Sequence, residues 1–347
     1  MAVHTSALQA LKLVQLKNIA VKCGINSSGT KSILASRIFS EIAVTNPPFP
    51  EDAIPIATAT VTPSSIAAKQ NKQKTIGHSS RATRVLSIDM GIRNLAYCIL
   101  DNPSWKKHTK STIPSLIAWK RIAISPRPHA SPLDSAKETF EPQAYASLAY
   151  LLTQTLLSYR PTLVLIERQR YRSAGSSAVQ EWTVRVNMFE GMLYAVLHTL
   201  QVEGRWSGLV RGVAPGKVGA FWVKGTGNGT AKTSRTAKWR NKTAKIDLVG
   251  KWLETGGSGV LTMYTDESNQ TAEAFLERWK GRKKGKRSVL QRADDTDVAT
   301  KEGAGEKLHK LDDLADCLLQ GLAWIRWEEN KLKILAGGVT ALEELVI

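Results

Sequence analysis

The chain has 347 residues and is strongly basic, with 48 Lys and Arg against 30 Asp and Glu and a formal net charge of +18. This charge favours a polyanionic partner, nucleic acid before an anionic membrane. No apolar run approaches the ~18 residues that span a bilayer, so we expect no membrane partner. The three cysteines, Cys23, Cys98 and Cys317, form no CxxC pair, which argues against a zinc site and against a disulfide framework.

The N-terminal region, residues 6–43, predicts a helical hairpin. Apolar residues at helical spacing indicate one helix before the turn Gly24–Thr30 and one helix after it. The stretch GINSSGTKS and the residues around it resemble the SAP-type DNA-binding motif. That resemblance implies a module over residues 1–44, with Lys31 and Arg37 as DNA contacts.

The same region has a second interpretation. Residues 1–40 contain no Asp or Glu but several Lys and Arg, and an acid-free amphipathic start is typical of mitochondrial presequences. Targeting and DNA binding are therefore both open from these residues alone.

A change of composition follows. Residues 45–83 are rich in Pro, Ser, Thr and Ala, a composition that cannot bury a core and that predicts a flexible linker. We expect a catalytic domain over residues 84–347.

Hydrophobic periodicity predicts the elements of that domain. Expected strands are Val85–Asp89, Asn94–Leu100, Ser115–Ile124, Thr162–Glu167 and Gly208–Val213, and expected helices are Gln143–Tyr159, Val179–Val202 and Leu308–Glu329. Three strands, a helix, a strand, a helix and a strand, followed by late helices, is the order of the RNase H-like fold. The predicted class is α/β, with a mixed sheet flanked by helices and a small all-α module at the N-terminus.

Acidic residues stand at informative places in this basic chain. Asp89 and Glu167 each end an apolar strand, and Asp312, Asp313 and Asp316 lie on the last helix. Carboxylates gathered at one sheet edge suit a hard cation such as Mg²⁺, which takes oxygen ligands. Two such ions held close together hydrolyse phosphodiesters, one activating water and the other stabilising the leaving oxygen.

Helical geometry limits the role of the last three carboxylates. Asp312 and Asp316 are spaced i, i+4, and Asp313 and Asp316 are spaced i, i+3, so either pair shares a face. Asp312 and Asp313 point about 100° apart, so at most one of them is expected to join Asp316 at a metal.

Three sequence blocks identify a family. IDMGIRNLAYC, IERQRYRSAGS with VRVNMFEGMLYAVL, and KLDDLADCLLQGLAW resemble the signature blocks of the fungal mitochondrial Holliday junction resolvases, relatives of bacterial RuvC. The resemblance covers most of residues 85–327. It implies a homodimeric endonuclease of the mitochondrial matrix that nicks two opposing strands of a four-way DNA junction. It also implies two Mg²⁺ ions per site, which Mn²⁺ can replace, and no small-molecule cofactor. Carried over by motif position, the resemblance implies that the catalytic carboxylates are Asp89, Glu167, Asp312 or Asp313, and Asp316. The expected metal ligands are Asp89, Glu167, Asp313 and Asp316.

The basic residues of the chain are candidate phosphate contacts, because the planar guanidinium group of Arg matches the geometry of a phosphate. The segments Lys224–Lys245 and Lys280–Arg292 are acid-free, and their pattern predicts no regular structure. Beyond the N-terminal module, the candidate DNA contacts are Arg93, Arg168, Arg170, Arg172, Lys232, Arg235, Lys238, Arg240, Lys283 and Lys284. We also consider His309, one turn before the helical carboxylates, for proton transfer.

Alternative functions fit parts of this pattern. A sugar kinase or actin-like ATPase also opens with a strand–DxGxxN–strand turn, but it would need a second such turn and would not need a +18 charge. A DNA-packaging protein explains the charge but not the carboxylates. An RNase H-like nuclease without junction selectivity explains both features.

Overall fold

The computed structural model describes residues 5–43, 83–91, 95–102, 113–124, 141–169, 181–223, 234–257, 259–291 and 311–346, with side chains outside the description at 5, 234–240, 283–291 and 346. The strands are β1 (Thr83–Asp89), β2 (Leu95–Asn102), β3 (Ser115–Ile122), β4 (Leu163–Glu167), β5 (Leu209–Val213) and β6 (Thr262–Met263). The helices are α1 (Thr5–Ala10), α2 (Leu13–Lys22), α3 (Lys31–Ala43), α5 (Pro142–Leu157), α6 (Glu181–Val202), α7 (Pro215–Trp222), α8 (Ser234–Glu254), α9 (Asp266–Gln291) and α10 (Leu311–Val346).

The six strands of the described chain form one mixed sheet in the order β5-β4-β1-β2-β3-β6. β1, β2 and β3 are antiparallel neighbours, whereas β4 runs parallel to β1, and β5 runs parallel to β4. The RNase H-like order predicted from the sequence is therefore confirmed. β6, which the sequence reading missed, adds a short parallel strand beside β3.

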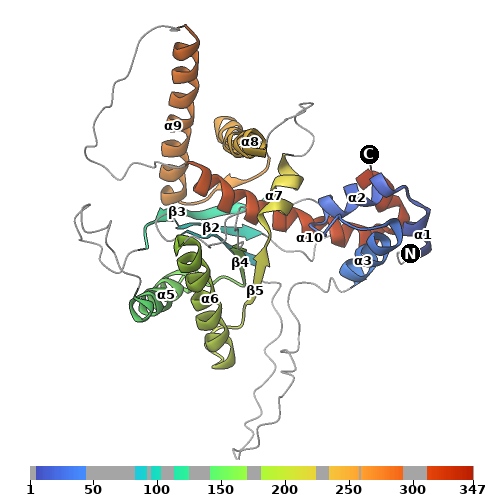
Figure 1. Cartoon of the computed structure of the whole chain (residues 1–347), viewed down its shortest axis with the longest axis horizontal. Helices are drawn as coiled ribbons and strands as arrows, with labels where there is room; N and C mark the ends of the chain where they lie inside the picture. The colour runs from blue at the N-terminus through green and yellow to red at the C-terminus, as the bar shows by residue number, and fades with distance from the viewer. Residues whose placement is uncertain are drawn as a thin grey trace, which may run out of the picture.

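Helices cover both faces of the sheet (Figure 1). Along β1, alternate residues face opposite sides: Val85 packs with α7–α10, whereas Leu86 and Ile88 pack with α5 and α6. β1 and β4 are buried on both faces, which explains their nearly continuous apolar runs. Within the described residues, no helix is long and apolar enough to span a bilayer.

The N-terminal helices share a hydrophobic core with the end of α10. Leu16, Ile19 and Ile38 are buried together with Ile334 and Leu342. Figure 1 shows α10 running from the sheet to α1–α3. The single helix predicted before Gly24 is in fact α1 and α2, divided at Leu11 and Lys12. The predicted linker lies almost wholly outside the described residues.

Three further predictions of local structure need correction. The basic segment expected to lack regular structure before Lys245 is helical from Ser234, and the second basic segment belongs to α9 as far as Gln291. The last helix does not end at Glu329 but continues to Val346, with a kink at Gly338. Cys98 and Cys317, which fall in apolar stretches of the sequence, are buried.

Candidate active site

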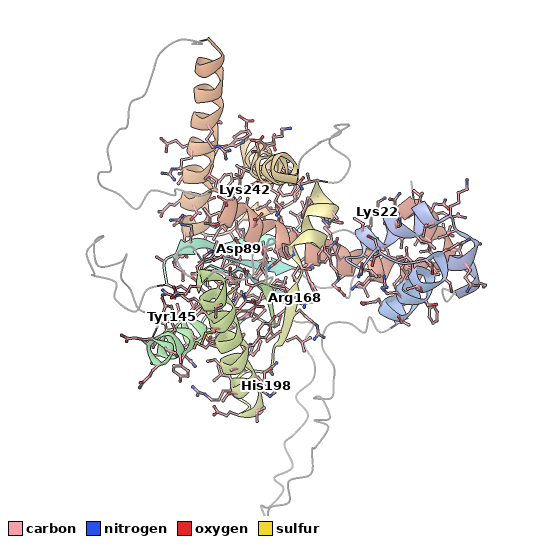
Figure 2. All side chains as sticks on the ribbon, in the orientation of Figure 1. Lys22, Asp89, Tyr145, Arg168, His198 and Lys242 are labelled. Atoms are coloured by element: carbon pink, nitrogen blue, oxygen red, sulfur yellow. The ribbon has the colours of Figure 1, made fainter. Side chains whose placement is uncertain are left out.

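Two acidic side chains meet where β1 and β4 end. The strands are parallel neighbours and Ile88 pairs with Ile166, so Asp89 and Glu167 come next on each strand. Their carboxyl groups share a hydrogen bond. Figure 2 shows Asp89 in the layer of the sheet, with α6 on one side and α8 on the other. The predicted convergence of these two residues at one sheet edge is what the geometry shows.

Buried polar contacts fix α10 across this edge. The Ser87 hydroxyl donates to the carbonyl oxygen of Cys317 at 2.8 Å. The Gln320 side-chain amide donates to the Ser87 hydroxyl and to the carbonyl oxygen of Ile88, both at 3.1 Å. On β3, the Trp119 indole N–H donates to the carbonyl oxygen of Leu314 at 3.0 Å. These contacts set the position of the helix that carries the remaining carboxylates.

The Asp89 carboxyl is the electrostatic centre of the site. Burial raises its pKa well above the ordinary value, and the neighbouring charges of Glu167, Asp316 and Asp313 raise it further. An isolated buried carboxylate is costly, and like charges nearby add to that cost. The chain thus holds four carboxylates in a place where a cation or a proton is needed.

Lysines of α8 face two of the helical carboxylates. Lys245 Nζ lies 2.8 Å from Asp316 Oδ1, and Lys242 forms an ion pair with Asp312. Burial raises the pKa of Asp316, although Lys245 opposes this effect. In this arrangement no three acidic, His or Cys side chains of the described residues are grouped closely enough to ligate one ion. The oxygen-only donor set of Asp89, Glu167, Asp313 and Asp316 nevertheless suits Mg²⁺.

Asp312 and Asp313 occupy different environments, as their helical spacing predicts. The charge of Asp313 acts on Asp89, and Asp313 Oδ2 lies 4.0 Å from Arg121 of β3. Asp312 instead contacts α8 through Lys242. Of the two, Asp313 is the one directed toward the strand ends.

The predicted DNA contacts divide by location. Arg168 follows Glu167 directly and is exposed. Lys31 is exposed on α3, whereas Arg37 donates from one guanidinium nitrogen to the carbonyl oxygens of Asn26 and Ser28 at 2.6 and 2.7 Å. The remaining candidates lie outside the described residues or side chains: Arg93, Arg170, Arg172, Lys232, Arg235, Lys238, Arg240, Lys283 and Lys284. His309 also lies outside them.

Four residues of the site were missed by sequence reasoning. Lys242 and Lys245 belong to an acid-free basic run that was interpreted as a contact to DNA phosphates, and nothing in that run marks them as partners of α10. Arg121 lies within a predicted strand and belongs to no motif. Gln320 carried a usable signal, because a Gln one turn after Asp316 on an otherwise apolar helix face requires a buried hydrogen-bond partner.

Comparison with known proteins identifies relatives. Residues 85–334 match the family model described as mitochondrial resolvase Ydc2 / RNA splicing MRS1. The mitochondrial cruciform cutting endonuclease 1 of Schizosaccharomyces pombe is 27% identical over 253 residues, which cover 71% of this chain and 79% of the relative. Its namesake in Saccharomyces cerevisiae is 23% identical over 262 residues, which cover 71% and 69%. The crystal structure of the yeast mitochondrial Holliday junction resolvase Ydc2 shares the fold, with a TM-score of 0.52, 22% identity and coverage of 96% of this chain and 98% of that one.

Proposed function

The chain belongs to the family of the mitochondrial resolvase Ydc2 and the RNA-splicing protein MRS1, and on this premise we propose that it is a Holliday junction resolvase. In this role it cleaves four-way DNA junctions by paired symmetric nicks. Two relatives named as cruciform cutting endonucleases support the substrate. Recombination and segregation of mitochondrial DNA is the process that such an activity serves.

The observation that carries the proposal is the group of half-buried carboxylates gathered at the ends of β1 and β4. A family that includes an RNA-splicing protein also admits a function of binding alone, for which a basic surface is sufficient. Binding alone gives no reason to bury Asp89 against Glu167, Asp313 and Asp316, which destabilises its charged form. Hydrolysis assisted by a metal gives that reason.

In the proposed mechanism, Asp89, Glu167, Asp313 and Asp316 would hold divalent cations, Mg²⁺ or Mn²⁺, with two ions per site. The chemistry that such ions would supply is activation of a water and stabilisation of the leaving oxygen. The protein orients the carboxylates through the buried contacts of Ser87 and Gln320 to α10 and β1. Lys245 and Lys242 balance the charge of Asp316 and Asp312 from the α8 side.

The positive surface positions the DNA. Arg168, beside Glu167, is proposed to contact a phosphate next to the cleaved bond. Lys31 and Arg37 extend the contacts onto the N-terminal module, and the basic segments around α8 and α9 supply the remaining ones. Contacts of this kind fix register on the duplex without reading sequence.

We further propose a homodimer that acts in the mitochondrial matrix. Two opposing strands of a two-fold symmetric junction need two active sites, and a two-fold dimer provides them in matching orientation. The compartment is supported by two relatives that are named as mitochondrial.

The testing experiment compares cleavage of a synthetic mobile four-way junction with cleavage of linear duplex of the same sequence, in Mg²⁺. Paired symmetric nicks on the junction alone are expected. Asp89→Asn should bind the junction but not cut it. Equal cutting of duplex would indicate a nuclease without junction selectivity. If the protein binds DNA tightly without cutting it, a packaging role is indicated. If it binds a structured RNA tightly without cutting, a splicing role is indicated.

A further inference from the structure

Arg168 follows a defined path away from the active site. Its backbone N–H donates to the carbonyl oxygen of Val213 at 2.9 Å, so the pairing of β4 with β5 continues past Glu167. Its side chain then crosses Gly212 of β5. A Cβ on Gly212 would lie 2.9 Å from Arg168 Cγ and 3.1 Å from its Cδ. The arginine stem therefore occupies the space that any other residue at position 212 would fill.

Helix α6 supports the same segment from the other side. The Tyr194 hydroxyl lies 2.9 Å from the position that a Cβ of Gly212 would take. Glu190 Oε2 accepts a hydrogen bond from the backbone N–H of Gln169 at 3.1 Å. The half-buried Glu190 carboxylate also interacts electrostatically with Arg168. The arginine directly after Glu167 is thus held between α6 and β5.

A second cation lies beyond the end of β5. Lys217 is on α7, which begins two residues after that strand, and it is half-buried. Burial lowers its pKa, and the charges of Lys331, Arg168 and Arg37 lower it further, whereas Glu41 opposes them. Cations on α10, on α3 and directly after β4 therefore act on Lys217, and their repulsion disfavours its charged form.

The N-terminal helices are fixed against α7 and α10, so Arg37 has a set place in this group. Gly24 has a φ of +65°, and the Trp327 ring of α10 packs where a Cβ of Gly24 would be. Trp327 in turn meets Phe221 of α7, with ring centroids 6.0 Å apart. Asn330 donates to the carbonyl oxygen of Lys22 at 2.6 Å. Figure 1 shows α7 between β5 and the N-terminal helices.

We propose that Arg168, Lys217 and Arg37, here called the phosphate strip, bind the backbone of one duplex arm as it leaves the Glu167 site, crosses α7 and reaches the N-terminal helices. Like charges gathered from separate elements repel one another, and a row of phosphates offsets that repulsion. Glu190 and Tyr194 are positioning residues that act through Arg168, and Gly212 supplies the space. This inference rests on the proposed function, since it assigns the path of the DNA at the same site.

The strip is tested by junction binding in EDTA, so that the result does not depend on whether the junction is cut. Lys217→Gln and Arg37→Gln should each reduce the slope of log affinity against log salt by about one. Stepwise shortening of the arms should abolish the effect of Arg37→Gln before that of Lys217→Gln. The control is Arg205→Gln, an equal charge change on an exposed residue before the opposite end of β5. Equal effects of all three variants, or effects independent of arm length, would overturn the proposal.

The role of Gly212 is tested by a double-mutant cycle in the same assay. Gly212→Ala displaces the Arg168 stem, so it should weaken binding as Arg168→Gln does and have no further effect in an Arg168→Gln background. Gly219→Ala is the control, because its added Cβ meets no atom within 4 Å. Thermal melts confirm that each variant is folded. Additive losses in the double variant would show that Gly212 acts through strand packing rather than through Arg168.

Discussion

The position of Asp89, a proposed metal ligand, destabilises the charged form of its carboxyl group in the folded protein. Its folded-state pKa is raised by burial and by three neighbouring carboxylates, so the folded protein holds this proton more tightly than the unfolded chain does. The stability associated with the proton is fully present below the ordinary Asp pKa. It is lost as pH rises through the raised folded-state value.

Asp89→Asn should therefore raise the melting temperature at neutral pH in EDTA, because the amide removes a buried negative charge. The gain should vanish below about pH 3, where Asp89 is protonated in both the folded and the unfolded state. The measurement is a series of thermal melts across pH. Glu203→Gln, which removes an exposed carboxylate, serves as the control and should show no such gain. An equal or lower melting temperature for Asp89→Asn at neutral pH would contradict the prediction.

Gln320 is the residue that ties α10 to the strand carrying Asp89. Gln320→Leu removes the hydrogen bonds to Ser87 and Ile88, and leaving buried groups without partners costs about 1–3 kcal/mol. We expect slower junction cleavage with unchanged junction affinity, measured by single-turnover kinetics. Gln201→Leu is the matched control. It loses a 2.6 Å hydrogen bond to the carbonyl oxygen of Gly208, remote from the carboxylates, and should lower stability without slowing cleavage.

At this scale, the sequence was informative where a residue's role follows from its own neighbours. Asp89 and Glu167 could be predicted because each ends a short apolar strand, and parallel strands bring their ends to one edge. Lys242 and Lys245 could not be predicted, because their partners on α10 lie about 70 residues away. Contacts between elements so distant in sequence depend on tertiary packing that local pattern does not encode.

Among the elements, α10 connects the two parts of the molecule. Its first turns carry Asp313 and Asp316 toward the sheet, and its later turns place Ile334 and Leu342 in the core of the N-terminal helices. The N-terminal module therefore has a fixed orientation relative to the carboxylates.

Ile334→Ala should destabilise the N-terminal helices more than the sheet. Ile334 is fully buried, and truncation of such a side chain costs about 2–5 kcal/mol. Hydrogen exchange should show loss of amide protection in α2 and α3 before any loss in β1. Leu335→Ala, one residue along and 37% exposed, is the control. Uniform loss of protection across the chain would show instead that both parts unfold as one unit.

The helices α8 and α9 explain why element prediction failed where charge was dense. The glycine-rich pattern of these acid-free segments was taken as a sign of irregular structure, yet the Lys and Arg residues that dominate them have high helix propensity. What fixes α8 is its last half, where Ile246 and Val249 are buried against α10. In α9, Phe275 and Trp279 serve the same purpose. These buried apolar residues follow the basic stretch in α8 and precede it in α9. A prediction based on the basic stretch alone therefore does not detect the helix.

Over the whole molecule, a basic body surrounds an acidic centre. The net charge of +18 draws a polyanion to the surface, whereas the carboxylates at the strand ends repel the phosphate that must reach them. Cations bound at the carboxylates would remove this repulsion at the place where hydrolysis occurs. Attraction over the surface favours binding of DNA, and repulsion at the carboxylates makes its cleavage depend on a metal ion.

The proposed homodimer makes a prediction at this scale. A supercoiled plasmid with an extruded cruciform should be converted directly to linear product, because two sites cut opposing strands within the lifetime of one complex. A single nick relaxes the plasmid, and the cruciform is then reabsorbed, so isolated cuts yield nicked circles. Mixed dimers, in which one subunit carries Asp89→Asn, should produce nicked circles, as measured by gel electrophoresis of the plasmid. Linear product at an unchanged fraction from purified mixed dimers would show that one site cuts both strands, and the two-fold match between protein and junction would then have no role in resolution.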